Sequence, residues 1–91
     1  MKVVWTEAAL ADLDNILAYT AENYLSLVAP VERRIRAVIA RIGRWPASAR
    51  AVEQRPGVHV VPLIRYPYRL FYRVVGDAIE VLHIHHAARD D

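Results

Sequence analysis

Three side chains in the last third of the sequence could act on a phosphate ester: Arg69, His86 and Arg89. Cleavage of RNA requires an activated 2′-oxygen, neutralisation of the charge that builds on phosphorus, and protonation of the 5′-oxygen. Histidine moves protons near neutral pH, and arginine stabilises negative charge without titrating. These residue types therefore suit part of an RNA-cleaving site. Arginine also contacts carboxylates in a bidentate fashion, so an acidic protein partner fits the same residues.

A β-hairpin is expected to position these residues. Gly76-Asp77 is typical of a two-residue turn, and apolar-rich runs flank it at about 68–75 and 78–86. Pairing the strands through this turn places Arg73 opposite Glu80, where the two side chains can form a cross-strand ion pair. Arg73 is therefore interpreted as a structural residue.

Away from the turn, the same pairing assigns the candidate residues to one face of the hairpin. It makes two further cross-strand pairs: Phe71 with Leu82, and Arg69 with Ile84. His86 follows on that face, so Arg69, His86 and Arg89 are expected to form an exposed patch around an apolar floor. The opposite face is more apolar and is predicted to be buried. It carries Tyr68, Leu70, Tyr72, Val74, Ile79, Val81, His83 and His85.

Apolar residues at helical spacing predict two helices before the hairpin. Thr6 is predicted to cap a first helix that runs to about Tyr24. The second helix is expected to begin near 26–30, with Pro30 in its first turn and Gly43 as its stop. Glu32 and Arg36 can pair across one helical turn. The predicted buried stripe of this helix is Val31, Ile35, Val38, Ile39 and Ile42.

The order of these elements predicts an α+β fold: a short N-terminal strand, a two-helix hairpin and a three-stranded antiparallel meander. The first strand spans 3–5 and is expected at the sheet edge, and the meander strands lie at about 58–65, 68–75 and 78–86. The helices should cover one face of the sheet. No linker or repeat divides the sequence, so residues 1–91 are expected to form a single domain.

Charge is distributed unevenly along the 91 residues. Residues 1–32 hold one lysine and five acidic residues, whereas residues 33–89 hold eleven arginines and three acidic residues. An acidic protein segment and RNA would both be attracted to the basic part. The sequence has no cysteine, no signal-peptide pattern and no apolar run near the ~20 residues that cross a bilayer. A cytoplasmic protein without membrane attachment is therefore expected.

Several short motifs together resemble one bacterial protein family. They are Val3 to Ala9, Asp12-Leu13 followed by Ile16 and Tyr19, Trp45-Pro46, Tyr68 to Val74, and His86-Ala87-Ala88-Arg89-Asp90. In this order and spacing they resemble the RelE/ParE toxins of type II toxin–antitoxin, or plasmid stabilisation, systems. The resemblance covers the whole chain and implies a growth-inhibiting toxin.

The two branches of that superfamily imply different activities. In the RelE branch, arginines matching Arg69 and Arg89 take part in ribosome-dependent mRNA cleavage. That branch also uses lysines on the preceding strand and a proton-transfer group close to the terminus. The strand at 58–65 contains no lysine, and no tyrosine follows Arg89. The ParE branch, which poisons DNA gyrase by binding it and does not cut nucleic acid, is the closer resemblance.

Two functional classes therefore stay open. The favoured one is a non-enzymatic toxin that binds gyrase. The alternative is a ribosome-dependent mRNA endoribonuclease whose catalytic residues would be Arg69, His86 and Arg89. A third reading is a toxin-fold protein that has lost toxicity and only binds its partner.

The resemblance also implies a cognate acidic antitoxin that forms a hetero-oligomer with the chain. DNA gyrase is the expected target, with the ribosome and mRNA as the alternative. The predicted target- and antitoxin-binding residues are Arg65, Arg69, Phe71, His86 and Arg89. No cofactor and no metal are expected, because His83 and His86 should point to opposite faces with no acidic residue near them.

Overall fold

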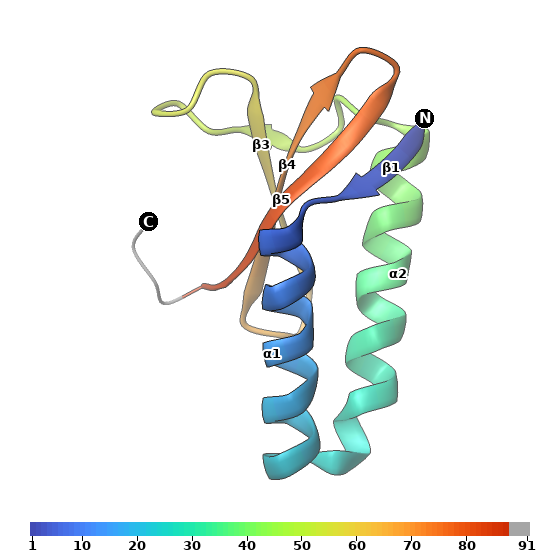
Figure 1. Cartoon of the computed structure of the whole chain (residues 1–91), viewed down its shortest axis with the longest axis vertical. Helices are drawn as coiled ribbons and strands as arrows, with labels where there is room; N and C mark the ends of the chain where they lie inside the picture. Colours follow the sequence, from blue (N-terminus) through green and yellow to red (C-terminus); the bar gives the residue numbers. More distant parts are fainter. Residues whose placement is uncertain (88–91) are drawn as a thin grey trace.

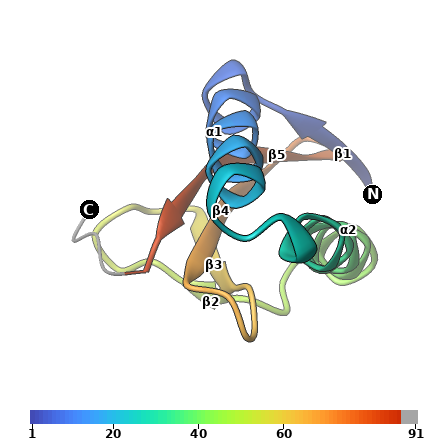
Figure 2. The same cartoon turned by 90° about the horizontal axis from the view of Figure 1, so that it is seen from below.

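The computed structural model describes residues 1–87, in which two helices pack against one face of a five-stranded sheet (Figures 1 and 2). The elements are β1 (Lys2–Trp5), α1 (Glu7–Asn23), the short 3-10 helix η1 (Leu25–Leu27), α2 (Val28–Arg44), β2 (Arg50–Ala51), β3 (Val58–Pro62), β4 (Tyr68–Val75) and β5 (Ala78–His86). This order confirms the predicted α+β class. Within the described residues, no helix has the length and apolar character needed to cross a membrane.

Local sequence signals account for both long helices. Thr6 caps α1 as predicted, because its hydroxyl oxygen accepts a hydrogen bond from the amide of Ala9 at 3.1 Å. Pro30 lies in the first turn of α2, where its missing amide proton breaks no helical hydrogen bond. Glu32 and Arg36 form the predicted exposed ion pair across one turn of α2 at 3.6 Å.

Gly43 serves the packing of the first strand and does not end α2, which continues to Arg44. The predicted helix stop is therefore wrong. The amino group of Met1 donates a hydrogen bond to the carbonyl oxygen of Gly43 at 2.7 Å. A Cβ atom at Gly43 would lie 3.3 Å from the Met1 carbonyl oxygen and 3.3 Å from Val3 Cγ2. The missing side chain lets β1 lie close against the end of α2.

The sheet has the order β1-β5-β4-β3-β2 (Figure 1). β1 runs parallel to β5 at the sheet edge, as expected, and the other pairs are antiparallel. β2 was not predicted, since it has only two residues. β3 ends at Pro62, short of the predicted end at 65, because the chain turns over 63–67 with the amide of Leu63 bonded to the carbonyl of Tyr68.

A β-bulge in the hairpin changes which side chains share a face. The pairing through Gly76-Asp77 is regular as far as Tyr72 opposite Val81, and the predicted Arg73–Glu80 ion pair forms at 2.8 Å. The register then shifts by one residue. The predicted pairs are wrong beyond this point, and the pairs that the structure has are Phe71 with His83, Leu70 with Ile84, Arg69 with His85 and Tyr68 with His86.

The main core lies between the helices and one face of the sheet. The predicted apolar stripe of α2 is buried in this core, except that Ile39 is only half-buried. Ile84 of β5 also lies in this core. His83 and His85 were predicted on the core face of the sheet but lie on its outer face. The residues of the main core are Ala9, Ile16, Val31, Ile35, Val38, Ile42, Leu63, Leu70, Tyr72, Ile79, Val81 and Ile84.

A second, smaller apolar cluster covers the outer face of the sheet. Val58, Val60 and Phe71 form it, with Val52 and Leu82 packed against them. Phe71 is only 5% exposed. The sequence analysis predicted that the apolar floor around Arg69 is exposed. This prediction is wrong, because Val52, in the segment after β2, packs against the cluster that contains Phe71.

Tyr72 connects the sheet to the segment between α2 and β2. Its side chain is fully buried, and its hydroxyl donates a hydrogen bond to the carbonyl oxygen of Pro46 at 2.6 Å. Its ring stacks on His59, whose Nδ1 lies 3.1 Å from the carbonyl oxygen of Ala49. Burial raises the pKa of the Tyr72 phenol above 10.0, with the Ala49 backbone acting in the opposite sense. The hydroxyl thus stays protonated and remains a donor.

We expect Tyr72→Ala to lower the free energy of unfolding by about 3–5 kcal/mol, because it removes a fully buried aromatic ring. Tyr72→Phe should cost only about 1–2 kcal/mol, because it removes the hydrogen bond to Pro46 and keeps the ring. Urea unfolding of the two variants measures both values. Equal losses for the two variants would show that the ring contributes little.

Candidate functional site

The bulge separates two residues that were predicted to act together. Arg69 lies opposite His85 on the outer face of the sheet, whereas His86 lies opposite Tyr68 on the face that carries the helices. The prediction that Arg69 and His86 share one exposed patch is therefore wrong. Arg89 lies outside the described residues.

On the outer face, Arg69 lines a groove between β4 and the loop that follows β2. Its Nη2 atom donates a hydrogen bond to the carbonyl oxygen of Ala87 at 3.3 Å, and its guanidinium carbon lies 6.0 Å from the centre of the Phe71 ring. Phe71 is the buried floor beneath this arginine and offers a partner little surface. We call this surface the outer groove, and it is lined by Arg50, Ala51, Val52, Glu53, Gln54, Val60, Arg69 and Phe71.

On the helix side, His86 is exposed at the end of β5. Its ring meets the Tyr68 ring edge to face, with the centres 5.6 Å apart. Burial, and less strongly the neighbouring Tyr19, raises the pKa of the Tyr68 phenol above 10.0. Tyr68 therefore stays neutral near pH 7.

Arg65 belongs to a third surface, between α2 and the turn that joins β3 to β4. Its backbone has a φ of 81°, a left-handed conformation that non-glycine residues seldom adopt. Three arginines converge here, because Arg33 and Arg34 from α2 line the same hollow. We call this surface the basic groove, and it is lined by Pro30, Arg33, Arg34, Ala37, Arg65 and Tyr66. It suits a carboxylate- or phosphate-bearing partner.

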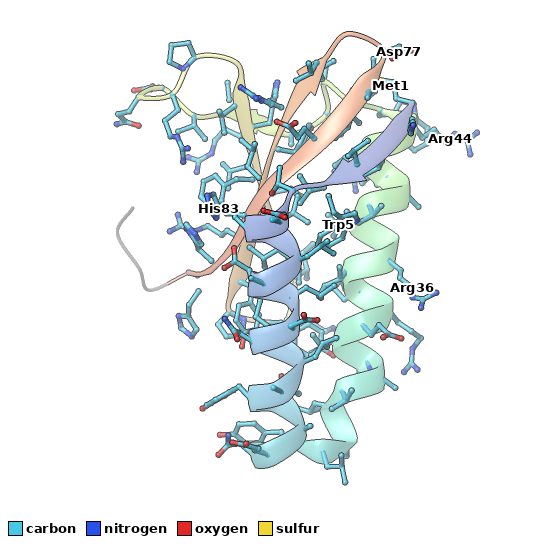
Figure 3. The ribbon with its side chains drawn as sticks, in the orientation of Figure 1. Met1, Trp5, Arg36, Arg44, Asp77 and His83 are labelled. Atoms are coloured by element: carbon cyan, nitrogen blue, oxygen red, sulfur yellow. The ribbon has the colours of Figure 1, made fainter. Side chains whose placement is uncertain are left out.

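An apolar groove between α1 and α2 was missed by the sequence analysis. Leu10 is 46% exposed and Leu13 and Leu17 are half-buried, although all three recur at helical spacing. Figure 3 shows Trp5 at the sheet end of the two helices and Arg36 projecting outward from α2. We call this surface the helix groove, and it is lined by Trp5, Leu10, Leu13, Leu17, Glu32, Ile35, Arg36, Ile39 and Ala40.

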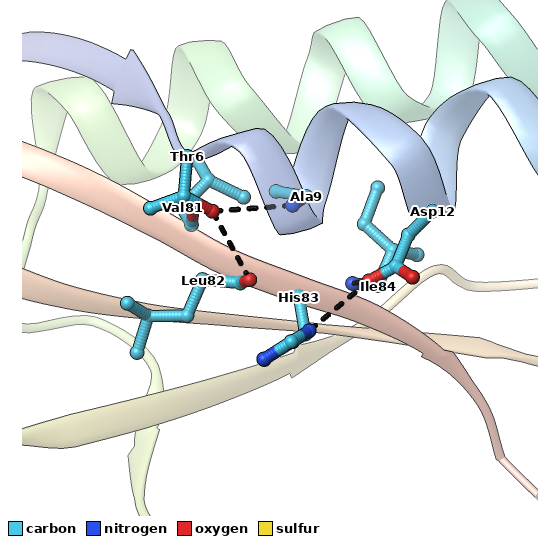
Figure 4. Close-up of polar contacts among 7 residues, drawn as sticks. All are labelled: Thr6, Ala9, Asp12, Val81, Leu82, His83 and Ile84. Carbon is cyan, nitrogen blue, oxygen red and sulfur yellow. Dashed lines mark hydrogen bonds and ion pairs between the residues drawn. The ribbon is translucent and has the colours of Figure 1, made fainter.

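The start of α1 is bonded to β5 just beyond the end of β1 (Figure 4). The hydroxyl of Thr6 lies 2.8 Å from the carbonyl oxygen of Val81 and donates a hydrogen bond to it. Asp12 Oδ2 accepts a hydrogen bond from the amide of Ile84 at 3.0 Å and lies 3.2 Å from His83 Nδ1. The expectation that no acidic residue lies near the histidines is therefore wrong.

Comparison with known proteins identifies the family. Residues 3–91 match the model of a family described as the ParE toxin of the type II toxin–antitoxin system parDE. The chain belongs to the ParE toxin family. A Sinorhizobium fredii protein named "Putative toxin Y4kP" is 33% identical over 86 residues, which are 94% of this chain and 88% of that protein.

A solved structure supports the same membership. A chain of the "Chromosomal ParDE TA system from P. aeruginosa" is 25% identical and superposes with a TM-score of 0.72, covering 94% of this chain and 95% of that one. This ParE-family chain is therefore a toxin of a type II toxin–antitoxin system, and the family implies an antitoxin partner. The resemblance inferred from the sequence motifs is confirmed.

We expect Asp12→Ala to lower the free energy of unfolding of this ParE-family toxin by about 1–3 kcal/mol, because the amide of Ile84 loses its acceptor. Asp12→Asn should cost less, since the amide oxygen can still accept that bond. Thermal unfolding measures both variants, with Asp14→Ala on the exposed side of α1 as the control. A loss for Asp14→Ala as large as that for Asp12→Ala would contradict this role.

Proposed function

We propose that this toxin arrests growth by binding DNA gyrase and does not itself cleave nucleic acid. The observation that supports this proposal is the separation of Arg69 from His86 by the β-bulge. An RNA-cleaving site needs its proton-transfer and charge-neutralising groups within hydrogen-bond reach of one phosphate. Two side chains that leave the sheet on opposite faces do not meet that requirement. β3 also carries no lysine that could replace either group.

One observation favours a ribosome-dependent endoribonuclease as the second candidate. The register shift that removes His86 from the outer face places His85 opposite Arg69 there. The His85 ring packs against Phe71 with the centres 5.6 Å apart and against His83 with the centres 4.7 Å apart. Because both neighbours restrict its reach toward a substrate, we rank this candidate below gyrase binding.

The surfaces of the chain support neutralisation by an acidic antitoxin. The helix groove exposes apolar side chains that an amphipathic antitoxin helix could cover. The basic groove offers three arginines to the carboxylates of the same partner. An antitoxin segment that is disordered alone and folds over both grooves would bury the apolar residues and balance the positive charge.

Two assays on the purified toxin distinguish gyrase from the ribosome as its target. We expect the toxin to inhibit DNA supercoiling by gyrase and to leave mRNA on translating ribosomes intact. Codon-specific cleavage of mRNA together with unaffected gyrase would reverse the ranking, and loss of that cleavage in His85→Ala would then identify the second candidate site.

The proposed target contacts include Arg65, Arg69, His86 and Arg89, with Phe71 as the buried support of Arg69. We expect Arg69→Ala and Arg89→Ala each to reduce growth inhibition while changing the free energy of unfolding by only about 0.5 kcal/mol. Arg73→Ala is the control, because this exposed arginine already pairs with Glu80. Full growth inhibition by both Arg69→Ala and Arg89→Ala would contradict this assignment.

For the antitoxin, we expect Leu10→Lys to weaken binding at least about tenfold, because it places a charge among apolar contacts of the helix groove. Leu10 is 46% exposed, so the fold should tolerate the change. Calorimetry with the purified cognate antitoxin measures the affinity. Val75→Lys is the matched control, because Val75 is 48% exposed at the hairpin tip and lies outside all three grooves. Equal weakening by both variants would argue against the helix groove as the docking surface.

A further inference from the structure

Asp12, His83 and His85 bring three potential metal-ligating side chains together where α1 meets β5. Their ligand atoms all lie within 4.8 Å of one another, and all three residues are half-buried. His83 and His85 are two positions apart on one strand, and Asp12 comes from the second turn of α1. Figure 4 shows His83 and Asp12 pointing toward one another. Among residues 1–87, potential ligands gather in such a group only here.

We propose that these three residues bind one divalent transition-metal ion of the zinc class, with solvent completing its coordination. Two imidazole nitrogens and one carboxylate oxygen form a donor set that suits Zn²⁺, Co²⁺, Ni²⁺ and Cu²⁺. Ca²⁺ and Mg²⁺ prefer sites made of oxygen atoms, so they should bind poorly here.

The distance between Asp12 Oδ2 and His83 Nδ1 fits two ligands of one such ion. Two ligand atoms that each lie about 2.1 Å from an ion in a tetrahedral site are roughly 3.4 Å apart. Asp12 Oδ2 and His83 Nδ1 are separated by 3.2 Å, which is close to this spacing. The ring of His85 is centred 4.7 Å from the ring of His83, and its ligand atom lies within 4.8 Å of those of Asp12 and His83.

The backbone holds these ligands in place before an ion arrives. The amide of Ile84 donates to Asp12 Oδ2 at 3.0 Å, which fixes the orientation of the carboxylate. Both histidines are carried by a strand that pairs with β4, so their positions are set by the sheet. The side chains of His83 and Asp12 are 35% and 26% exposed, which leaves an ion a path from solvent.

The β-bulge is what makes the site possible. In a regular hairpin, His83 and His85 would point toward the helices with the core residues. The register shift turns them to the outer face, beside the edge that Asp12 reaches from α1. A bound ion would cross-link α1 to β5, two elements that are distant in the sequence, and should stabilise the folded chain.

Titration of the full-length, chelator-treated chain with ZnCl₂ in a calorimeter tests the proposal. We expect saturable binding of one ion per chain and a rise of several degrees in the melting temperature when zinc is in excess. His83→Ala and His85→Ala should each weaken binding at least about tenfold, and Asp12→Asn about 10- to 100-fold.

His86→Ala is the matched control, because His86 is exposed, adjacent in sequence and outside the proposed ligand set. It should leave zinc affinity within about twofold of the parent chain. The d–d absorption of bound Co²⁺ should disappear in His85→Ala and persist in His86→Ala. Circular dichroism checks that each variant is folded. If His83→Ala does not fold, the zinc affinity of His85→Ala tests the proposal. No saturable binding, or equal losses for His85→Ala and His86→Ala, would overturn the proposal in favour of adventitious binding by neighbouring histidines.

Discussion

The fold depends on which groups hydrogen-bond to the edge of β5 beyond the point where β1 ends. β1 pairs with β5 only as far as Trp5 opposite Val81, yet β5 continues to His86. Beyond that point the backbone groups of β5 on this edge need other partners, because unpaired groups at a sheet edge are costly when buried and promote aggregation when exposed. Thr6 and Asp12 supply those partners from the start of α1. One short segment thus caps a helix and closes a strand edge.

The hydrogen bonds from α1 to the edge of β5 and the β-bulge together determine which side chains each face of the sheet presents. Ile84 donates its amide to Asp12 and places its side chain in the main core. Its neighbours His83 and His85 are consequently displayed on the other face, within reach of Asp12 and Arg69. The ring of His86 contacts the ring of Tyr68 on the helix side. A single extra residue in β5 therefore decides which histidine lies opposite Arg69 of β4.

Features that depend on neighbouring residues could be predicted from the sequence. The cap at Thr6, the position of Pro30, the Gly76-Asp77 turn and the Arg73–Glu80 pair each follow from local geometry. The bulge could not be predicted, because no glycine or proline in β5 marks it and regular pairing was the simplest assumption. The contact between Asp12 and His83 joins residues 71 positions apart, so it followed only from the assembled sheet. The helix groove was missed because helical spacing identifies an apolar stripe without showing how much of it is covered.

The surfaces assigned to partners are distinct from the contacts that hold the fold. The helix groove and the basic groove are built mainly on exposed or half-buried side chains of α1 and α2, whereas Thr6, Asp12 and Tyr72 bond elements of the sheet to the rest of the chain. A chain of 91 residues with 55% hydrophobic content has too little interior to bury all its apolar side chains. A partner that covers the helix groove, as we propose for the antitoxin, would therefore add to the stability of the chain. Changes at exposed groove positions such as Leu10, which lies outside the main core, should therefore alter the proposed partner binding without unfolding the toxin.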